Sequence, residues 1–349
     1  YSLNQMAVTL KVKRLQAGQK APVIDGDPND EIWTSAKTMV IKTVKGINFP
    51  NDELAISVTA LHDGKEVYFK FQWDDPDLSV KRLPLMKTPE GWKVMQTGVE
   101  RKNENTYYED QLAVYLTKLG NNRGCASSCH LGGGDAKNPK GVHYTRGEIA
   151  DLWHWRAIGS NSTGSLKGEL GLVADEYIGP AKPRPADSEA RYSGGHDIDP
   201  GSGGYRQNFT KLDAEKTLSQ TQVLPVKLPA AVPVKLSLDL KNVEADGPWW
   251  IADSAGVAYS RNRDHYPLYT VLPSVLVAPY QGDRGHVWSR ASWKKGRWTV
   301  EMKRVLDTKS KYDIAFKPGK SVYMSVAAFN RTETRHSEHL RPIRLLLQP

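Results

Sequence analysis

Short runs in which apolar and polar residues alternate constrain this sequence more than any other feature. Residues 54–60 and 67–73 alternate in this way, and the Asp63-Gly64 pair between them is a strong hairpin signal. Similar runs lie at residues 112–116, 234–240, 300–302, 322–328 and 343–347, and a tight turn is expected between Trp293 and Trp298. The sequence therefore predicts an all-β fold, a β-sandwich of antiparallel strands with long loop insertions.

The strand pattern is interrupted once, between residues 179 and 208. This stretch is rich in Pro, Gly, Ser and Asp, a composition typical of a long loop. Because strand patterns lie on both sides, we interpret the stretch as an insertion and not as a linker. We expect the 349 residues to form a single domain, residues 1–349.

Composition excludes several classes of protein. With 10 Trp, 15 Tyr and 6 Phe, the chain is too aromatic to be disordered. No run approaches the roughly 18 apolar residues of a membrane-spanning helix, so no membrane span is expected. The net charge of +9 favours an acidic partner, but no nucleic-acid-binding motif accompanies it. The first residue, Tyr1, is typical of a chain whose signal peptide has been removed.

The two cysteines of the chain are the most informative residues for chemistry. Cys125 and Cys129 are separated by three residues, and His130 follows directly. The usual haem c attachment motif is Cys-x-x-Cys-His, in which the thiols form thioethers and the histidine ligates iron. The spacer here is one residue longer, which still lets two sulfurs reach two vinyl groups. We therefore predict a haem c bound by Cys125 and Cys129, with His130 on the iron.

Three other interpretations of the cysteines remain. A zinc ion would need four ligands, and Cys125, Cys129, His130 and His143 could supply them. A disulfide between the cysteines would suit an oxidising compartment. A chance cluster of buried residues is the third. The direct Cys-His step favours haem over zinc.

A low-spin haem needs a second axial ligand, which the residues alone leave open. His154 lies between two tryptophans, and His336 and His339 follow the late strand that begins near residue 322. Met95 is a further option. No Gly-x-Ser-x-Gly, His-Glu-x-x-His or P-loop pattern is present, so hydrolytic chemistry is not indicated.

Several weak motifs, taken in order, resemble one known family. They are Ile24-Asp25-Gly26 with Trp33 and Ala36, residues 68–75, Glu109-Asp110-Gln111-Leu112, residues 151–155, and Gly296 to Val300 running into Arg304. From about residue 20 to 349 the chain resembles the haem-binding γ subunits of ethylbenzene dehydrogenase and its relatives. These relatives belong to the DMSO reductase superfamily of molybdenum enzymes and include nitrate reductases and nitrite oxidoreductase.

The resemblance implies particular haem ligands. In b-type members of the family a Met after the central strand and a Lys near the C-terminus hold the iron. Here residues 125–130 stand in the Met region, and His336 stands near the Lys region. The resemblance therefore implies a bis-His haem c with His130 proximal and His336 distal, with His154 or His339 as alternatives to His336. It leaves a second, non-covalent haem undecided.

The resemblance also implies a function. We expect an electron-transfer subunit, without catalysis of its own, because bis-His ligation leaves no open position on the iron. Its partners would be iron–sulfur and molybdenum subunits and a soluble redox carrier, with nitrite or nitrate conversion as the preferred reaction of the complex. Covalent haem attachment implies a periplasmic or equivalent extracytoplasmic location. The alternative is a carbohydrate-binding β-sandwich module, which the Asp25-Gly26 and Trp33 pattern also resembles but which leaves Cys125 to His130 unexplained.

Overall fold

The structure is a computed structural model, and it confirms the expected β-sandwich. It describes residues 8–95, 107–118, 143–158, 160, 171–180, 182–183, 192–193, 195–230, 235–236, 249–333 and 335–349. The short α-helix α1 (Glu31–Thr34) lies near the N-terminal end of the described chain. None of the helices among the described residues is long and apolar enough to cross a membrane.

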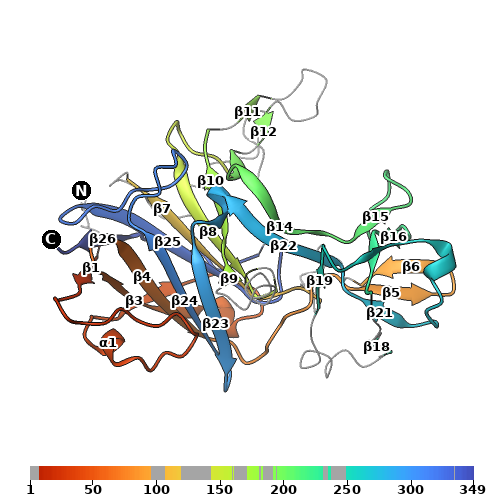
Figure 1. Cartoon of the computed structure of the whole chain (residues 1–349), viewed down its shortest axis with the longest axis horizontal. Coiled ribbons are helices and arrows are strands. Elements are labelled where there is room, and N and C mark those ends of the chain that lie inside the picture. The colour runs from red at the N-terminus through yellow and green to blue at the C-terminus, as the bar shows by residue number, and fades with distance from the viewer. Residues whose placement is uncertain are drawn as a thin grey trace.

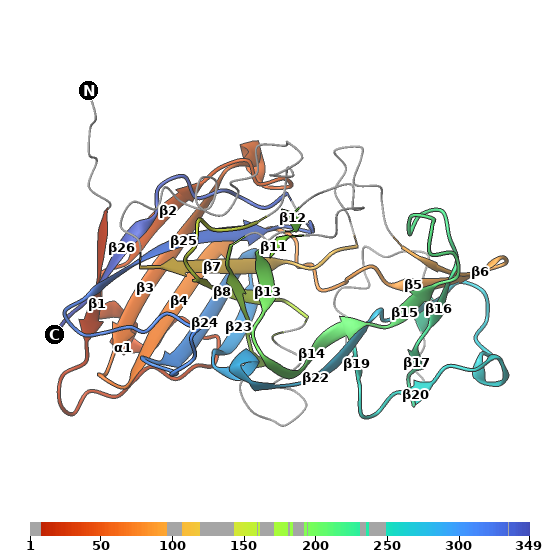
Figure 2. The same cartoon turned by 90° about the horizontal axis from the view of Figure 1, so that it is seen from above.

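Two sheets form the sandwich, and strand β1 belongs to both (Figures 1 and 2). The first sheet runs in the order β13 (His196–Ile198), β10 (Ala174–Ile178), β8 (Ala150–Arg156), β7 (Gln111–Thr117), β25 (Ser321–Phe329), β26 (Ile343–Leu347) and β1 (Thr9–Arg14). The second continues through β3 (Leu54–His62), β4 (Glu66–Asp74), β24 (Arg297–Val305), β23 (Trp288–Lys294) and β9 (Gly171–Leu172), with β2 (Met39–Thr43) on β3. Strand β1 is parallel to β26 and β3, and the other neighbours in these two sheets are antiparallel.

The predicted hairpins are present. Strands β3 and β4 pair from Ile56–Trp73 to His62–Val67, and Gly64 occupies the turn with φ of +86°. Strands β23 and β24 pair around Lys295 and Gly296, whose φ values are +51° and +74°. Both turns need left-handed backbone, which glycine adopts without steric cost.

The alternation of each strand places large aromatic rings between the sheets. The rings of Trp73, Trp155 and Trp298 lie 5.0 to 6.3 Å apart in the core. Arg304 is fully buried beside Trp153 and bonds Asp151 at 2.7 Å. This ion pair satisfies a charge that burial would otherwise make very costly.

A smaller six-stranded sheet lies beyond one end of the sandwich (Figure 2). Its order is β15 (Phe209–Lys211), β16 (Val223–Pro225), β6 (Gly91–Val94), β5 (Leu85–Thr88), β21 (Thr270–Leu272) and β18 (Lys235–Leu236). A ribbon of β14 (Gly201–Gln207) and β22 (Val275–Gly282), with β19 (Ile251–Ala252) on β22, leads to it from the sandwich. Of the strand expected at residues 234–240, only β18 falls on described residues.

Residues 179–208 are not the continuous loop that their composition predicts. They contain β13 and the seven-residue β14, besides the short pair β11 (Lys182–Pro183) and β12 (Tyr192–Ser193). The glycines that suggest a loop instead allow close pairing with β22. A Cβ atom at Gly203 would collide with the backbone of Pro279, and the register shifts between Ser202 and Gly204. Glycine at such a bulge permits close backbone approach.

Several motif residues have structural contacts inside the sandwich. Glu301 accepts hydrogen bonds from the Trp33 indole at 2.8 Å and from the Gly26 backbone at 2.8 Å. Asp110 likewise accepts a bond from the Trp298 indole at 3.0 Å. These contacts connect the N-terminal segment and the start of β7 to β24. The motif residues therefore stabilise the fold.

Candidate functional site

The cysteine motif lies outside the described residues, which stop at residue 118 and resume at His143. The chain resumes close to a cluster of polar side chains. The His143 carbonyl accepts a hydrogen bond from the Gly195 backbone at 2.6 Å, and the rings of His143 and His196 lie 6.2 Å apart. The described chain therefore resumes beside His196.

Strand β8 presents two chemically different faces. Trp153 and Trp155 point into the sandwich core, whereas His154 and Arg156 lie on the opposite face. That face is also buried: Leu152 is 8% exposed there, beside Ile178 on β10. Although His154 lies between two tryptophans in the sequence, its side chain therefore lies on the other face of the strand, beside Arg156 and Glu176.

Glu176 on β10 is the centre of the polar cluster. It accepts bonds from Arg156 Nη2 at 3.0 Å and from His196 Nε2 at 2.6 Å, and its carboxylate lies 3.6 Å from His154 Nδ1. Burial opposes the charge, but the charge of Arg156 and the bond from His196 outweigh it and hold the pKa of Glu176 well below its usual range. Glu176 is therefore a fixed anion among three nitrogen-bearing side chains.

His154 has one ring nitrogen in use and one without a partner. Arg156 Nη2 lies 3.0 Å from Nδ1, and since arginine only donates, Nδ1 accepts and the proton is on Nε2. Nε2 is buried and has no hydrogen-bond partner among the described residues. Burial, followed by the charge of Arg156, lowers the pKa of His154 to about 4. His154 is thus a neutral imidazole with a buried donor that needs an acceptor.

A stack of rings links His154 to His336. The His154 ring stacks on Phe329 at 5.5 Å, and Phe329 lies 4.8 Å from the His336 ring. His336 Nδ1 lies 2.7 Å from the Ser337 carbonyl, so Nδ1 donates and Nε2 carries the lone pair. A carbonyl on one ring nitrogen is the usual support for a histidine that ligates metal through the other.

His339 has the opposite arrangement. Its Nδ1 accepts a hydrogen bond from the Val326 backbone at 3.2 Å, which puts the proton on Nε2. The residue is 4% exposed, and burial lowers its pKa to about 4 against the effect of a backbone bond with Arg341. His339 therefore holds the chain after β25 in place.

A cavity of about 340 Å³ adjoins the cluster and shares Arg156 and Glu176 with it. Arg82, Tyr205 and Arg284 also line it. Arg82 Nη1 bonds the Tyr205 hydroxyl at 2.5 Å, and the Tyr205 ring lies 4.8 Å from its guanidinium. Nε of Arg156 is buried without a partner among the described residues. These guanidinium groups could bind carboxylates, such as haem propionates, or another small anion.

Some residues of the polar cluster and the cavity could have been predicted from the sequence, and others could not. Arg156 is two positions after His154, so the period of the strand places both on one face. Glu176, Phe329 and Tyr205 come from other strands, and only the pairing of β10 with β8, of β25 with β7, and of β14 with β22 brings them near. No local signal in their own segments identifies them.

The chain was compared with known proteins. The model of a family described as ethylbenzene dehydrogenase matches residues 30–341. No curated protein matches the chain.

Among solved structures, the chain is similar to a putative carbohydrate-binding protein from Bacteroides uniformis ATCC 8492, at 7% identity and a TM-score of 0.34, over 97% of this chain and 91% of that one. It is also similar to a family 9 carbohydrate binding module from Caldicellulosiruptor kristjanssonii in complex with glucose, at 8% identity and a TM-score of 0.34, over 98% and 97% of the two chains. At such identities and TM-scores neither likeness bears on function.

Proposed function

The chain belongs to the ethylbenzene dehydrogenase family, and on this premise we propose that it is an electron-transfer haem c subunit of a multi-subunit molybdenum oxidoreductase. Its partners would be the iron–sulfur and molybdenum subunits and a soluble redox carrier, outside the cytoplasm. Nitrite oxidoreductase and nitrate reductase are the complexes we favour. When bound, haem supplies a one-electron carrier whose potential depends on its axial ligands, hydrogen bonds and burial.

The observation that carries the proposal is the tautomer of His336, that is, which of its two ring nitrogens carries the proton. The Ser337 carbonyl fixes the tautomer with the lone pair on Nε2, as a metal ligand requires, and this supports the haem binding that the family resemblance implies. Cys125 and Cys129 would bind the porphyrin, and His130 would be the other axial ligand. His154 would donate its buried Nε2 proton to an acceptor, and Arg156 and Arg82 would pair with propionates.

The hydrogen bonds rank the three candidate distal ligands. His336 needs no change of tautomer to ligate through Nε2. His154 would have to exchange the bond from Arg156 for one to Glu176, 3.6 Å away. His339 would have to break its bond with Val326. We therefore propose His336 as the distal ligand, with His154 next.

The proposal is tested on purified full-length protein by a pyridine haemochrome spectrum and an intact mass under denaturing conditions. We expect a c-type spectrum and a polypeptide that retains the mass of one iron porphyrin. Cys125→Ser and Cys129→Ser should each lose a thioether, whereas Ser127→Ala, in the spacer, should bind haem normally. The haem-to-protein ratio decides whether a second, non-covalent haem is present.

Three results would contradict the proposal. A colourless protein, haem that is fully extracted by acid acetone, or one zinc ion per chain without haem would each do so. A colourless protein that binds soluble glucans would favour the carbohydrate-binding alternative.

A further inference from the structure

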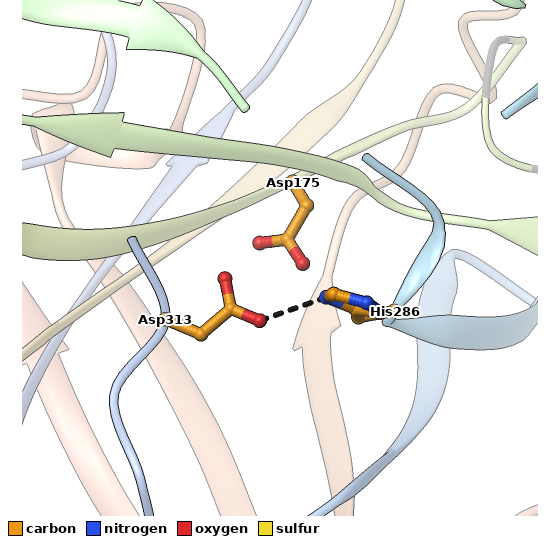
Figure 3. A group of neighbouring side chains, drawn as sticks. All are labelled: Asp175, His286 and Asp313. Atoms are coloured by element: carbon orange, nitrogen blue, oxygen red, sulfur yellow. Dashed lines mark hydrogen bonds and ion pairs between the residues drawn. The ribbon is translucent and has the colours of Figure 1, made fainter. Parts of the chain in front are cut away.

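Four chain segments bring three aspartates and a histidine together where the ribbon of β14 and β22 leaves the sandwich. Asp175 lies on β10, Asp199 follows β13, His286 follows η4 (Asp283–Gly285), and Asp313 lies between β24 and β25. One ligand atom from each of Asp175, His286 and Asp313 lies within 4.8 Å of the others. Figure 3 shows the carboxylates of Asp175 and Asp313 turned toward each other and toward the imidazole.

Most carboxylate oxygens in this group lack a partner. Asp175 and Asp199 are both 0% exposed, and neither oxygen of either one has a hydrogen-bond partner among the described residues. Oδ1 of Asp313 is also buried without a described partner, whereas its Oδ2 accepts a bond from His286 Nδ1 at 2.9 Å. Five oxygen atoms are therefore buried and unsatisfied, which is rare in native proteins.

The carboxylates of this cluster have no cation among the described residues that compensates their charge. Arg304 bonds Asp151 at 2.7 Å, so its charge compensates that carboxylate. The Arg284 side chain bonds the backbone oxygens of Asp199 and Gly203. Burial first, and then neighbouring carboxylates, raise the pKa of Asp175 well above its usual range. Burial first, and then a hydrogen bond with the Asp313 carboxyl, raise the pKa of Asp199 to about 9. A divalent cation would remove both the repulsion and the unsatisfied oxygens at once.

We propose that Asp175 and Asp313, with Asp199 beside Asp313, form a site for a hard divalent cation, for which Ca²⁺ is the best match. The five unsatisfied atoms are all oxygens, and oxygen-only sets select Ca²⁺ over metals that prefer nitrogen or sulfur. His286 is a positioning residue, because its Nδ1 holds Oδ2 of Asp313 and so orients Oδ1. The cation links β10 to the loop between β24 and β25 at the place where the ribbon leaves the sandwich. It therefore stabilises the junction between the sandwich and the ribbon that leads to the smaller sheet.

The alternative is that the carboxyls share protons and bind no metal. The two cases differ in what the wild type does. If the site holds protons only, the wild type should unfold at the same temperature with and without metal. If it holds Ca²⁺, the wild type should be stabilised by Ca²⁺, and Asp175→Asn should lose that response while remaining as stable as the wild type in EDTA, because Asn replaces a carboxyl that is protonated without the cation.

The test is thermal unfolding of full-length protein after treatment with EDTA, with Ca²⁺, Mn²⁺ or Zn²⁺ then added. We expect Ca²⁺ well above its dissociation constant to raise the Tm by several degrees, by mass action on the folded state. Asp175→Asn and Asp313→Asn should lose most of this shift. Asp74→Asn, a control at an exposed carboxylate of β4, should keep it.

Other outcomes overturn the proposal. The site is not a cation site if Ca²⁺ leaves the wild-type Tm unchanged or shifts Asp175→Asn equally. A response to Zn²⁺ alone would refute the oxygen-only set and make His286 a ligand. None of these measurements depends on haem, so the result is independent of the proposed electron-transfer function.

Discussion

At the scale of single residues, His336 and His339 differ in which ring nitrogen carries the proton. The Ser337 carbonyl keeps the proton of His336 on Nδ1, whereas the Val326 backbone keeps that of His339 on Nε2. We therefore predict that His336→Ala opens an axial position on the haem. Its dithionite-reduced form should bind carbon monoxide with a shifted Soret band, whereas the reduced wild type should bind none.

His339→Ala provides the matched comparison. It should leave the reduced spectrum unchanged but lower the free energy of unfolding by about 1–3 kcal/mol, because the buried Val326 amide loses its acceptor. His265→Ala, at an exposed position, should change neither property. If carbon monoxide binds after His339→Ala and not after His336→Ala, the assignment is reversed.

The buried pair of Arg304 and Asp151 leads to a second prediction. Arg304→Met should leave the Asp151 carboxylate without its cation and cost about 3–5 kcal/mol of unfolding free energy in urea titration. The double variant Arg304→Met with Asp151→Asn should lose less, because no unpaired charge stays buried. Equal losses in the single and double variants would show that the charge itself is not what matters.

At the scale of elements, the hairpin between β23 and β24 depends on left-handed backbone. Gly296→Ala should cost about 1–2 kcal/mol through φ alone, because an added Cβ would meet its nearest atom only at 3.7 Å. Lys295→Gly should be neutral or slightly stabilising, since Lys295 already has a φ of +51°. Urea midpoints of the two variants check this, and a loss of stability in Lys295→Gly would contradict it.

The elements also show what the sequence can predict. Strands β3, β4, β24, β25 and β26 follow from alternation, and two turns follow from Asp63-Gly64 and Lys295-Gly296, because these signals are local. The pairing of strands distant in sequence is not local. For this reason the smaller sheet, the strand formed by Gly201–Gln207 and the approach of Glu176 to Arg156 could not be predicted. The prediction of the haem motif at Cys125 rests on covalent chemistry and needs no fold.

At the scale of the whole molecule, polar contacts join the sandwich to the ribbon that leads to the smaller sheet. Tyr205 on β14 bonds Glu109, which precedes β7, and Arg82 bonds both. Glu109 also accepts a bond from the Ile158 backbone at 2.7 Å. Because these contacts cross between the two parts, we predict one cooperative unfolding transition for the full chain, as a single domain requires. Two separate calorimetric transitions would show that the smaller sheet is an independent domain.

The acidic cluster makes the stability of the whole molecule depend on pH. The pKa of Asp199 is raised to about 9 from an unfolded value of 3.8, by burial and by Asp313. Carboxylates or cations face the cluster from every neighbouring element: Asp151, Asp175, Asp283, His286 and Arg304. Between its unfolded pKa of 3.8 and its folded pKa of about 9, Asp199 therefore keeps a proton in the folded protein that the unfolded chain has lost, so this carboxyl makes stability fall as pH rises.

The expected slope is about 1.4 kcal/mol per pH unit for each such carboxyl, measured as the free energy of unfolding in EDTA. Asp199→Asn should lower the slope by the share of one carboxyl, since the pKa of Asp175 is raised as well. The buried histidines do not interfere, because the pKa values of His154 and His339 are lowered to about 4 and cost stability only below their unfolded value of 6.5. Ca²⁺ should also reduce the slope, since a cation bound at Asp175 and Asp313 would favour the ionised form of Asp199 beside them. A slope that persists unchanged in saturating Ca²⁺ would place the titrating carboxyls away from the cation.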